Sequence, residues 1–107
     1  MRGDFLKLLD VVLREYISIV EFIEQTEPVI NNRIIIDREL FKNLLGKYDY
    51  MNFSMKTKIY KSLNFIIHDK NNYTMPCKID KKAVRKVVIN YEAYTAIKQL
   101  YESEMNI

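Results

Sequence analysis

The feature that most constrains the fold is a run of apolar residues at helical spacing between Asp4 and Gln25. Residues three and four positions apart share one face of a helix, so this run predicts a long amphipathic helix over 4–25. Pro28 and the pair Asn31–Asn32 mark its end. The apolar stripe is wide enough to serve both a core and a partner subunit. The expected charged face opposite this stripe holds Lys7, Arg14, Glu15, Glu21 and Glu24.

Two shorter helices are expected after a short strand. The β-branched run Arg33–Ile36 predicts the strand, and Asp37 is placed to cap a helix over 38–45. A further helix is expected over about 54–67, with Asn52 or Ser54 as its cap. Its expected inner face consists of Met55, Ile59, Leu63, Ile66 and Ile67, and its expected free face of Lys56, Thr57, Lys58, Lys61 and Asn64.

A β-hairpin and a last helix complete the chain. Strands are expected over about 73–79 and 83–89, joined by a turn at 80–82, and Pro76 confines the first strand to an edge or a bulge. The final helix is expected over 91–104, capped by Asn90. No repeat, low-complexity segment or flexible linker divides the 107 residues, so we expect one mainly helical α+β domain over 1–107.

Charge is distributed unevenly along the chain. Residues 31–90 carry thirteen basic and five acidic residues, whereas residues 1–30 carry three and six, and residues 91–107 carry one and three. A positive surface confined to the middle of the chain is typical of a protein that binds a polyanion. The alternative is a solvated lysine-rich surface without a partner, and the charge distribution alone favours neither interpretation.

Several chemical classes are excluded by what the sequence lacks. Cys77 is its one cysteine and His68 its one histidine, which together form neither an internal disulfide nor a zinc site. We expect His68 to cap a helix end and Cys77 to pack as a small side chain. The sequence has no glycine-rich phosphate loop and no nucleophile elbow. We therefore expect no enzymatic activity, no cofactor and no metal.

The sequence also predicts a location. No apolar run reaches the roughly 18–20 residues that a membrane span requires. The first four residues lack the basic-then-apolar layout of a signal peptide. Together with the single cysteine, these features predict a cytoplasmic protein without a membrane partner.

The order of expected elements resembles the winged helix-turn-helix layout. Residues 33–89 supply a strand, two helices and a hairpin, and helices over 4–25 and 91–104 flank them. Within that class the chain is similar to small accessory proteins that bind a plasmid transfer origin beside the relaxase in low-GC Gram-positive bacteria. Transcriptional regulators and replication-initiation proteins share the layout. The resemblance implies a recognition helix over about 54–67 and a wing over about 73–89.

This resemblance and the basic segment 54–89 predict sequence-specific binding of double-stranded DNA. Lysines neutralise phosphates or contact guanine, and the methyl group of Thr57 is suited to thymine. Asn64 is suited to adenine, and Arg85 to a narrow minor groove. The candidate DNA-binding residues are Ser54, Lys56, Thr57, Lys58, Lys61, Asn64, Lys78, Lys81, Lys82, Arg85 and Lys86. The alternative is that these charges only keep the helix soluble and protect an edge strand.

The expected partners are DNA, a second copy of the chain, and a relaxase or another DNA-processing protein. The acidic first and last helices are expected to face away from DNA and to form the homodimer interface. Two other classes of function remain open. The protein could be a winged-helix module that docks another protein through its first helix, or a single-strand or RNA binder that stacks bases on its tyrosines. Because Tyr16, Tyr60, Tyr94 and Tyr101 lie at helical spacing with other apolar residues, we expect them to pack instead.

Overall fold

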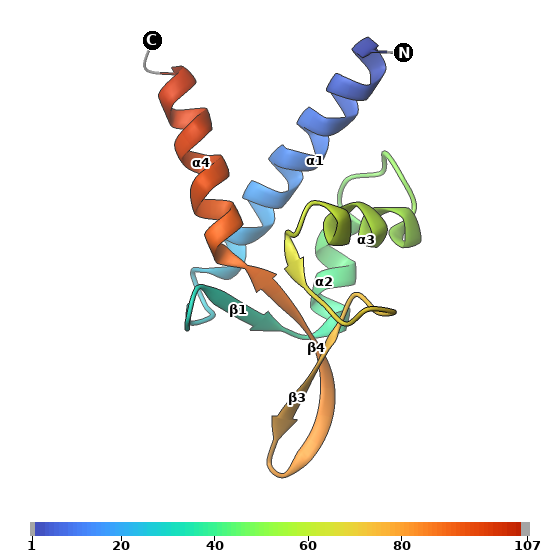
Figure 1. The fold of residues 1–107 in the computed structure, drawn as a ribbon, viewed down its shortest axis with the longest axis vertical. Coiled ribbons are helices and arrows are strands. Elements are labelled where there is room, and N and C mark those ends of the chain that lie inside the picture. The colour runs from blue at the N-terminus through green and yellow to red at the C-terminus, as the bar shows by residue number, and fades with distance from the viewer. Residues whose placement is uncertain (1, 106–107) are drawn as a thin grey trace.

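Strand β4 (Lys82–Asn90) connects two parts of the molecule (Figure 1). Its C-terminal half is buried and pairs antiparallel with β1 (Arg33–Ile36) on one side and with β2 (Ile66–Ile67) on the other. Its exposed N-terminal half pairs with β3 (Met75–Ile79) and projects away from the other elements. One strand therefore joins the core sheet to an exposed hairpin.

Four helices surround this sheet in the computed structural model, which describes the backbone of residues 2–105 and the side chains of residues 6–103. They are α1 (Arg2–Ile23), α2 (Arg38–Leu45), α3 (Phe53–Ser62) and α4 (Tyr91–Met105). The expectation of a largely helical α+β chain is confirmed for the described residues. The expected bounds of β1 and α2 match, β2 was not expected, and each of the other elements differs from its expected range at one or both ends.

The core lies where α1 and α2 cover the sheet. Buried side chains come from α1, β1, α2 and the C-terminal half of β4: Val12, Tyr16, Ile19, Val20, Ile23, Ile34, Ile36, Phe41, Leu44, Leu45, Val87 and Ile89. The ring of Tyr16 stacks on that of Phe65 with centroids 3.9 Å apart, and its hydroxyl donates to the carbonyl of Asn90. Tyr16 thus ties α1 to the junction of β4 and α4. Burial raises the pKa of its phenol well above the ordinary value of 10.0.

The C-terminal end of α3 differs from the expected helix over 54–67. Asn64 has a φ of 58°, its amide donates to the carbonyl of Lys61, and the amide of Phe65 donates to the carbonyl of Tyr60. These two bonds are those of a Schellman cap, in which the left-handed residue satisfies the last carbonyls of a helix. The rings of Tyr60 and Phe65 pack edge to face across this cap. The chain then turns back into β2, so the expectation that the helix continues through Ile67 is wrong.

The exposed hairpin has a two-residue turn. Asp80 and Lys81 have φ values of 51° and 69°, and the residues that flank them, Ile79 and Lys82, are paired. Positive φ at both central residues is the mark of a type I′ turn, whose twist matches that of the two strands. The expected hairpin is confirmed. Its first strand begins two residues later than expected and ends where expected, and its second strand extends one residue further at each end.

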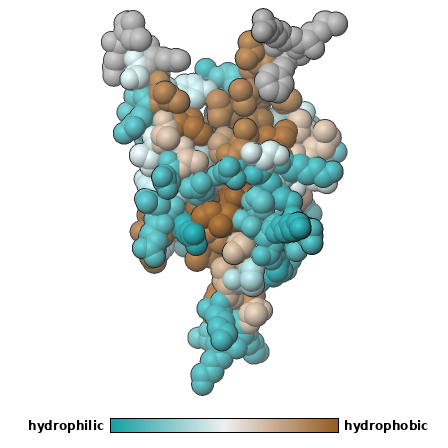
Figure 2. Space-filling view, in the orientation of Figure 1, coloured by the Kyte–Doolittle hydropathy of each residue, from teal (hydrophilic) through white to brown (hydrophobic). Residues whose placement is uncertain are grey.

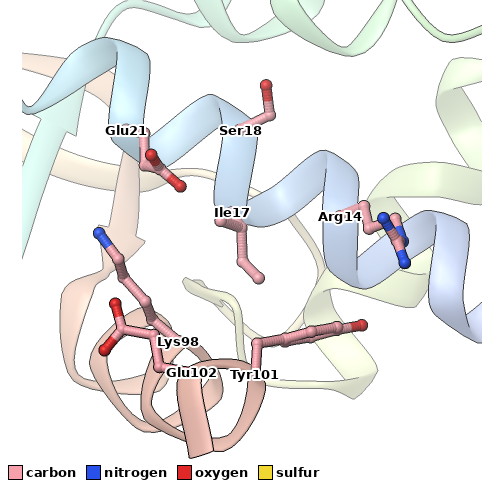
Figure 3. Close-up of a pocket in the computed structure, with 7 residues that line it drawn as sticks. All are labelled: Arg14, Ile17, Ser18, Glu21, Lys98, Tyr101 and Glu102. Atoms are coloured by element: carbon pink, nitrogen blue, oxygen red, sulfur yellow. The ribbon is translucent and has the colours of Figure 1, made fainter. Parts of the chain in front are cut away.

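Helices α1 and α4 diverge from the sheet on the side opposite the hairpin (Figure 1). Between the two helices lies a groove of about 410 Å³, with side chains of α1 on one side and side chains of α4 on the other (Figure 3). The lining residues are Arg14, Ile17, Ser18, Glu21, Lys98, Tyr101 and Glu102. Among residues 2–105, no helix combines the length and the hydropathy needed to cross a membrane.

Candidate nucleic-acid interface

One face of α3 presents polar and basic side chains to solvent. Asn52 begins the helix, because its side chain accepts a hydrogen bond from the amide of Met55 at 2.9 Å. Ser54, Lys58 and Lys61 then follow at positions i, i+4 and i+7, which lie on one side of a helix. Ser54 and Lys58 are exposed and Lys61 is half-buried. This side of α3 is therefore its polar and basic side.

The tip of the hairpin presents a second set of cations. Lys78, Lys81 and Lys82 are all exposed, and they lie within or beside the type I′ turn. Figure 2 shows hydrophilic surface over this tip and apolar surface between α1 and α4. Lys81 adopts a left-handed conformation that costs a residue with a Cβ about 1–2 kcal/mol. A lysine is therefore present where glycine would be easier to accommodate.

Two other predicted residues, Arg85 and Lys86, lie at the base of the hairpin and have partners within the chain. Arg85 donates to the hydroxyl and the carbonyl of Thr74 and pairs with the carboxylate of Asp69. Lys86 pairs with the carboxylate of Asp37. Asp37 begins α2 as expected, but its side chain makes no cap hydrogen bond. Both cations therefore hold the hairpin against neighbouring segments, and their charges are partly neutralised.

Lys56 and Thr57 do not lie on the free face of α3, so that part of the prediction is wrong. The side chain of Lys56 is 2% exposed and that of Thr57 is also buried. The hydroxyl of Thr57 donates to the carbonyl of Ser54 at 2.8 Å. Met55 and Leu63, which were expected to point inward, are exposed instead. The inner face of α3 is thus rotated relative to the face that hydropathy predicts.

A buried ion pair lies on the inner face of α3 that the structure shows. The ammonium of Lys56 donates to the carboxylate of Glu15 at 2.8 Å, to the carbonyl of Leu45 at 2.5 Å and to the carbonyl of Tyr48. The other oxygen of Glu15 accepts from the hydroxyls of Tyr50 and Tyr60, each at 2.7 Å. Glu15 is 1% exposed, so its expected place on the charged face of α1 is also wrong.

The Glu15 carboxylate also affects the ionisation of the two tyrosines that donate to it. Burial raises the pKa of the Tyr60 phenol well above 10.0, and the adjacent Glu15 carboxylate raises it further by repulsion and by its hydrogen bond. Burial and the hydrogen bond to Glu15 likewise raise the pKa of Tyr50. Both phenols therefore remain protonated donors to Glu15 up to strongly alkaline pH.

The sequence does contain a signal for this network. Glu15 lies three residues after Val12 and four before Ile19, and Lys56 lies three after Phe53 and four before Tyr60. Each charge therefore falls within an apolar stripe of its helix, and the two charges have opposite signs. A lone charge inside an apolar stripe marks a candidate for a buried pair, because burial without a partner is costly.

Asn64 lies outside the helix on which it was expected. It is exposed, and its backbone carbonyl accepts a hydrogen bond from the side chain of Asn90 at 2.8 Å. Its left-handed conformation suits asparagine, which adopts this region more readily than most residues. Asn64 thus has a structural reason for its identity that does not involve a base.

His68 and Cys77 each contact a backbone carbonyl that is close to them in the sequence. His68 Nδ1 lies 2.7 Å from the carbonyl of Asp69, and the half-buried thiol of Cys77 contacts the carbonyl of Met75. Among the described residues no cluster of three histidine, cysteine, aspartate or glutamate side chains is placed to hold a metal ion. Tyr16, Tyr60 and Tyr94 are buried, so they are not accessible for stacking on bases.

Six of the eleven predicted residues are exposed, on α3, at the cap of α3 and at the hairpin tip. They are Ser54, Lys58, Asn64, Lys78, Lys81 and Lys82. Lys61, Arg85 and Lys86 are half-buried, and Lys56 and Thr57 are buried. A comparison of the chain with known proteins identifies no matching family model and no matching curated protein.

Proposed function

We propose that this protein binds double-stranded DNA through the exposed face of α3 and the β3–β4 hairpin, and that it does so without catalysis. One observation carries the proposal. Lys58, Lys61, Lys78, Lys81 and Lys82 form no ion pair with any described residue, although acidic side chains pair with Lys56, Arg85 and Lys86. Unpaired lysines on α3 and at the hairpin tip can neutralise phosphates and release counterions.

The topology supports a winged-helix interpretation of this surface. The strand order β1–β4–β2, with α2 and α3 between β1 and β2 and with a hairpin on β4, is the arrangement that such a fold requires. In this interpretation the N-terminal half of α3, with Ser54 and Lys58, enters the major groove. The hairpin tip contacts the backbone or the minor groove. The left-handed Lys81 supports a role for the tip, because a strained residue that could be glycine often marks a functional site.

The biological role we propose is that of an accessory protein at a plasmid transfer origin, cytoplasmic and beside a relaxase. This role is supported by the order of the helices and strands along the chain. A transcriptional regulator or a replication-initiation protein would use the same surface on different DNA. Footprinting on the DNA around the gene separates these roles, because the protected site lies at a transfer origin, a promoter or a replication origin.

We also propose that α1 and α4 form a homodimer interface. Leu6 and Leu100 are 59% and 67% exposed on these helices. Both helices diverge on the side opposite the hairpin, so a dimer formed through them leaves the hairpin free. A dimer would read two half-sites and so gain affinity and specificity.

Fluorescence anisotropy with two labelled duplexes tests the DNA proposal. One duplex has random sequence, and the other comes from the DNA that flanks the gene. We expect tighter binding to the second, with an affinity that falls steeply with salt. The Lys58→Gln/Lys61→Gln variant should lower the salt slope by up to about 0.9 for each phosphate that is no longer neutralised. Arg33→Gln, on an exposed side chain of β1 at the end of β4 away from the hairpin, is the control and should leave the slope unchanged.

A protein-docking function is the second candidate, because an apolar groove of about 240 Å³ lies between α1 and α3. Its apolar lining comes from Leu8, Leu9, Val12, Ile59 and Leu63. If the protein binds neither duplex at low salt, the DNA proposal is overturned and this groove becomes the surface to investigate.

A further inference from the structure

We infer that Glu15 and Lys56 are positioning residues, which set the rotation of α3 about its own axis and thereby the direction in which Lys58 and Lys61 face. The effect on DNA recognition rests on the proposed function, whereas the effect on α3 does not. Neither residue was expected to be buried, and neither is part of the exposed surface described above.

The first argument is the composition of the inner face of α3. The buried residues of this helix are Lys56, Thr57 and Tyr60, and each has a polar group in its side chain. Phe53 and Ile59 are only half-buried, and Met55 is exposed. Apolar packing has no preferred direction, and on α3 it comes mainly from the rings of Tyr60 and Phe53. The orientation of this helix therefore depends on directional polar contacts to a greater degree than that of α1 or α2.

The second argument is the geometry of those contacts. The ammonium of Lys56 has three donors, and it uses them on Glu15 of α1, on the carbonyl of Leu45 at the end of α2 and on the carbonyl of Tyr48 in the following turn. Tyr60, one turn further along α3, donates to the same carboxylate. Glu15 thus holds α3 at two points four residues apart. Two fixed points on one face of a helix determine its rotation.

The third argument concerns the consequence for the exposed face. Successive residues of a helix are separated by about 100°, so Lys58 and Lys61 point away from the side on which Lys56 lies. A rotation of α3 by one residue would bury part of this basic face. A buried ion pair contributes little net stability compared with apolar side chains of similar volume, so directional contact is what it adds here.

Amide hydrogen exchange of the free protein tests the inference on four variants. In Tyr60→Phe, which removes one of the two points, we expect the amides of α3 to exchange several-fold faster while those of α1 and β4 keep their protection. In Glu15→Leu/Lys56→Met, exchange in α3 should be at least about tenfold faster. This double variant should have a higher Tm than Lys56→Met alone, because no buried charge is left without its partner. Lys58→Met, the same chemical change on the exposed face, is the matched control and should exchange like the parent.

A charge-swapped variant separates positioning from simple attraction. Glu15→Lys/Lys56→Glu retains opposite charges but directs a carboxylate at the carbonyls of Leu45 and Tyr48, which cannot donate to it. We expect amide exchange in α3 to be accelerated in this variant as strongly as in Glu15→Leu/Lys56→Met. If the charge-swapped variant had the Tm and the α3 exchange rates of the parent, the inference would be overturned. Unchanged exchange in both Tyr60→Phe and Glu15→Leu/Lys56→Met would overturn it as well.

The DNA measurement then gives the consequence for recognition. For Glu15→Leu/Lys56→Met we expect the Kd for the specific duplex to rise at least about tenfold, with a change of less than about twofold for random duplex. A merely destabilised protein would bind both duplexes more weakly, in proportion to its unfolded fraction. If the parent binds no DNA, the proposed function fails, whereas exchange in α3 still decides whether Glu15 and Lys56 position this helix.

Discussion

The guanidinium of Arg85 donates to both oxygens of Thr74, with 2.8 Å between Nε and the hydroxyl and 2.9 Å between Nη2 and the backbone carbonyl. The same guanidinium pairs with the carboxylate of Asp69, and the amide of Asp69 donates to the carbonyl of Thr74. Thr74 is buried. One side chain of β4 therefore closes the loop over residues 69–74 at the base of the hairpin.

This relationship predicts that Arg85→Ala destabilises the protein. Loss of the charged donor leaves the buried hydroxyl of Thr74 without this partner, which should lower the free energy of unfolding by about 1–3 kcal/mol. Arg85→Lys should recover only part of the lost free energy of unfolding, since an ammonium lacks the planar, forked arrangement of donors that a guanidinium has. Urea denaturation measures the change. Lys82→Ala, exposed on the same strand, is the control and should stay within about 0.5 kcal/mol of the parent. Equal stability of the two variants would contradict the assignment.

The left-handed turn predicts opposite effects of glycine at two adjacent lysines. Lys81→Gly should stabilise the protein by about 0.5 kcal/mol, because glycine relieves the positive φ but gains freedom in the unfolded chain. Lys82→Gly, within β4, should destabilise it by about 0.5–1 kcal/mol. Each variant loses one charge, so both should reduce the salt dependence of DNA binding. Thermal unfolding and anisotropy give the two readouts, and a salt slope that stays at the parent value in both would exclude the hairpin tip from the interface.

The Schellman cap predicts how Asn64 tolerates substitution. Asn64→Gly should be as stable as the parent or slightly more stable, whereas Asn64→Ala should lose about 1 kcal/mol, because alanine is strained at a φ of 58°. We expect DNA specificity to be unchanged in Asn64→Gly if the residue acts only as a cap. A selective loss of affinity for the specific duplex in this folded variant would restore the original expectation of an adenine contact.

The buried tyrosines predict a loss of stability at alkaline pH. The pKa values of Tyr16 and Tyr60 are raised in the folded protein, so above pH 10 the unfolded chain loses protons that the folded chain keeps. The contribution of each tyrosine to the free energy of unfolding is complete below pH 10. Above pH 10 this contribution falls by about 1.4 kcal/mol per pH unit for each tyrosine.

Tyr16→Phe isolates one of these two contributions. It should be about 1 kcal/mol less stable at pH 8, where it lacks the hydrogen bond to Asn90. It should then lose stability less steeply than the parent between pH 10 and 11. Urea denaturation at the three pH values gives both slopes, and other titrating groups cancel in the comparison. Parallel slopes would show that Tyr16 ionises normally in the folded protein.

The proposed homodimer predicts that Leu100→Glu shifts the protein toward the monomer. A charge on an exposed apolar position has little effect on the isolated domain, but it costs free energy when a partner covers it. Light scattering after size-exclusion chromatography measures the mass. Gln99→Glu, an exposed polar neighbour on α4, is the control and should keep the mass of the parent. A monomeric parent would refute the dimer directly.

Patterns among neighbouring residues were sufficient to predict those elements that depend on residues close together in the sequence. The β-branched run at β1 and the apolar spacing of α2 predicted both elements with the bounds observed. Asn52 and Asn90 cap their helices through their own side chains, which a sequence pattern can also indicate. The strand β2 was missed, because a strand of two residues exists only through its pairing with Val88 and Ile89, more than twenty positions away.

By itself the sequence determined the order of the elements other than β2, the amphipathic α1 and the concentration of positive charge between residues 31 and 90. These follow from the periodicity and composition of neighbouring residues. Only the tertiary structure decided which cations are free, because hydropathy assigns every lysine to solvent. Lys56 is instead buried against Glu15, a residue 41 positions earlier, and Arg85 and Lys86 are held by Asp69 and Asp37. The partner of a charge is set by the packing of distant segments, and that packing leaves the lysines of α3 and of the hairpin tip available for an outside ligand.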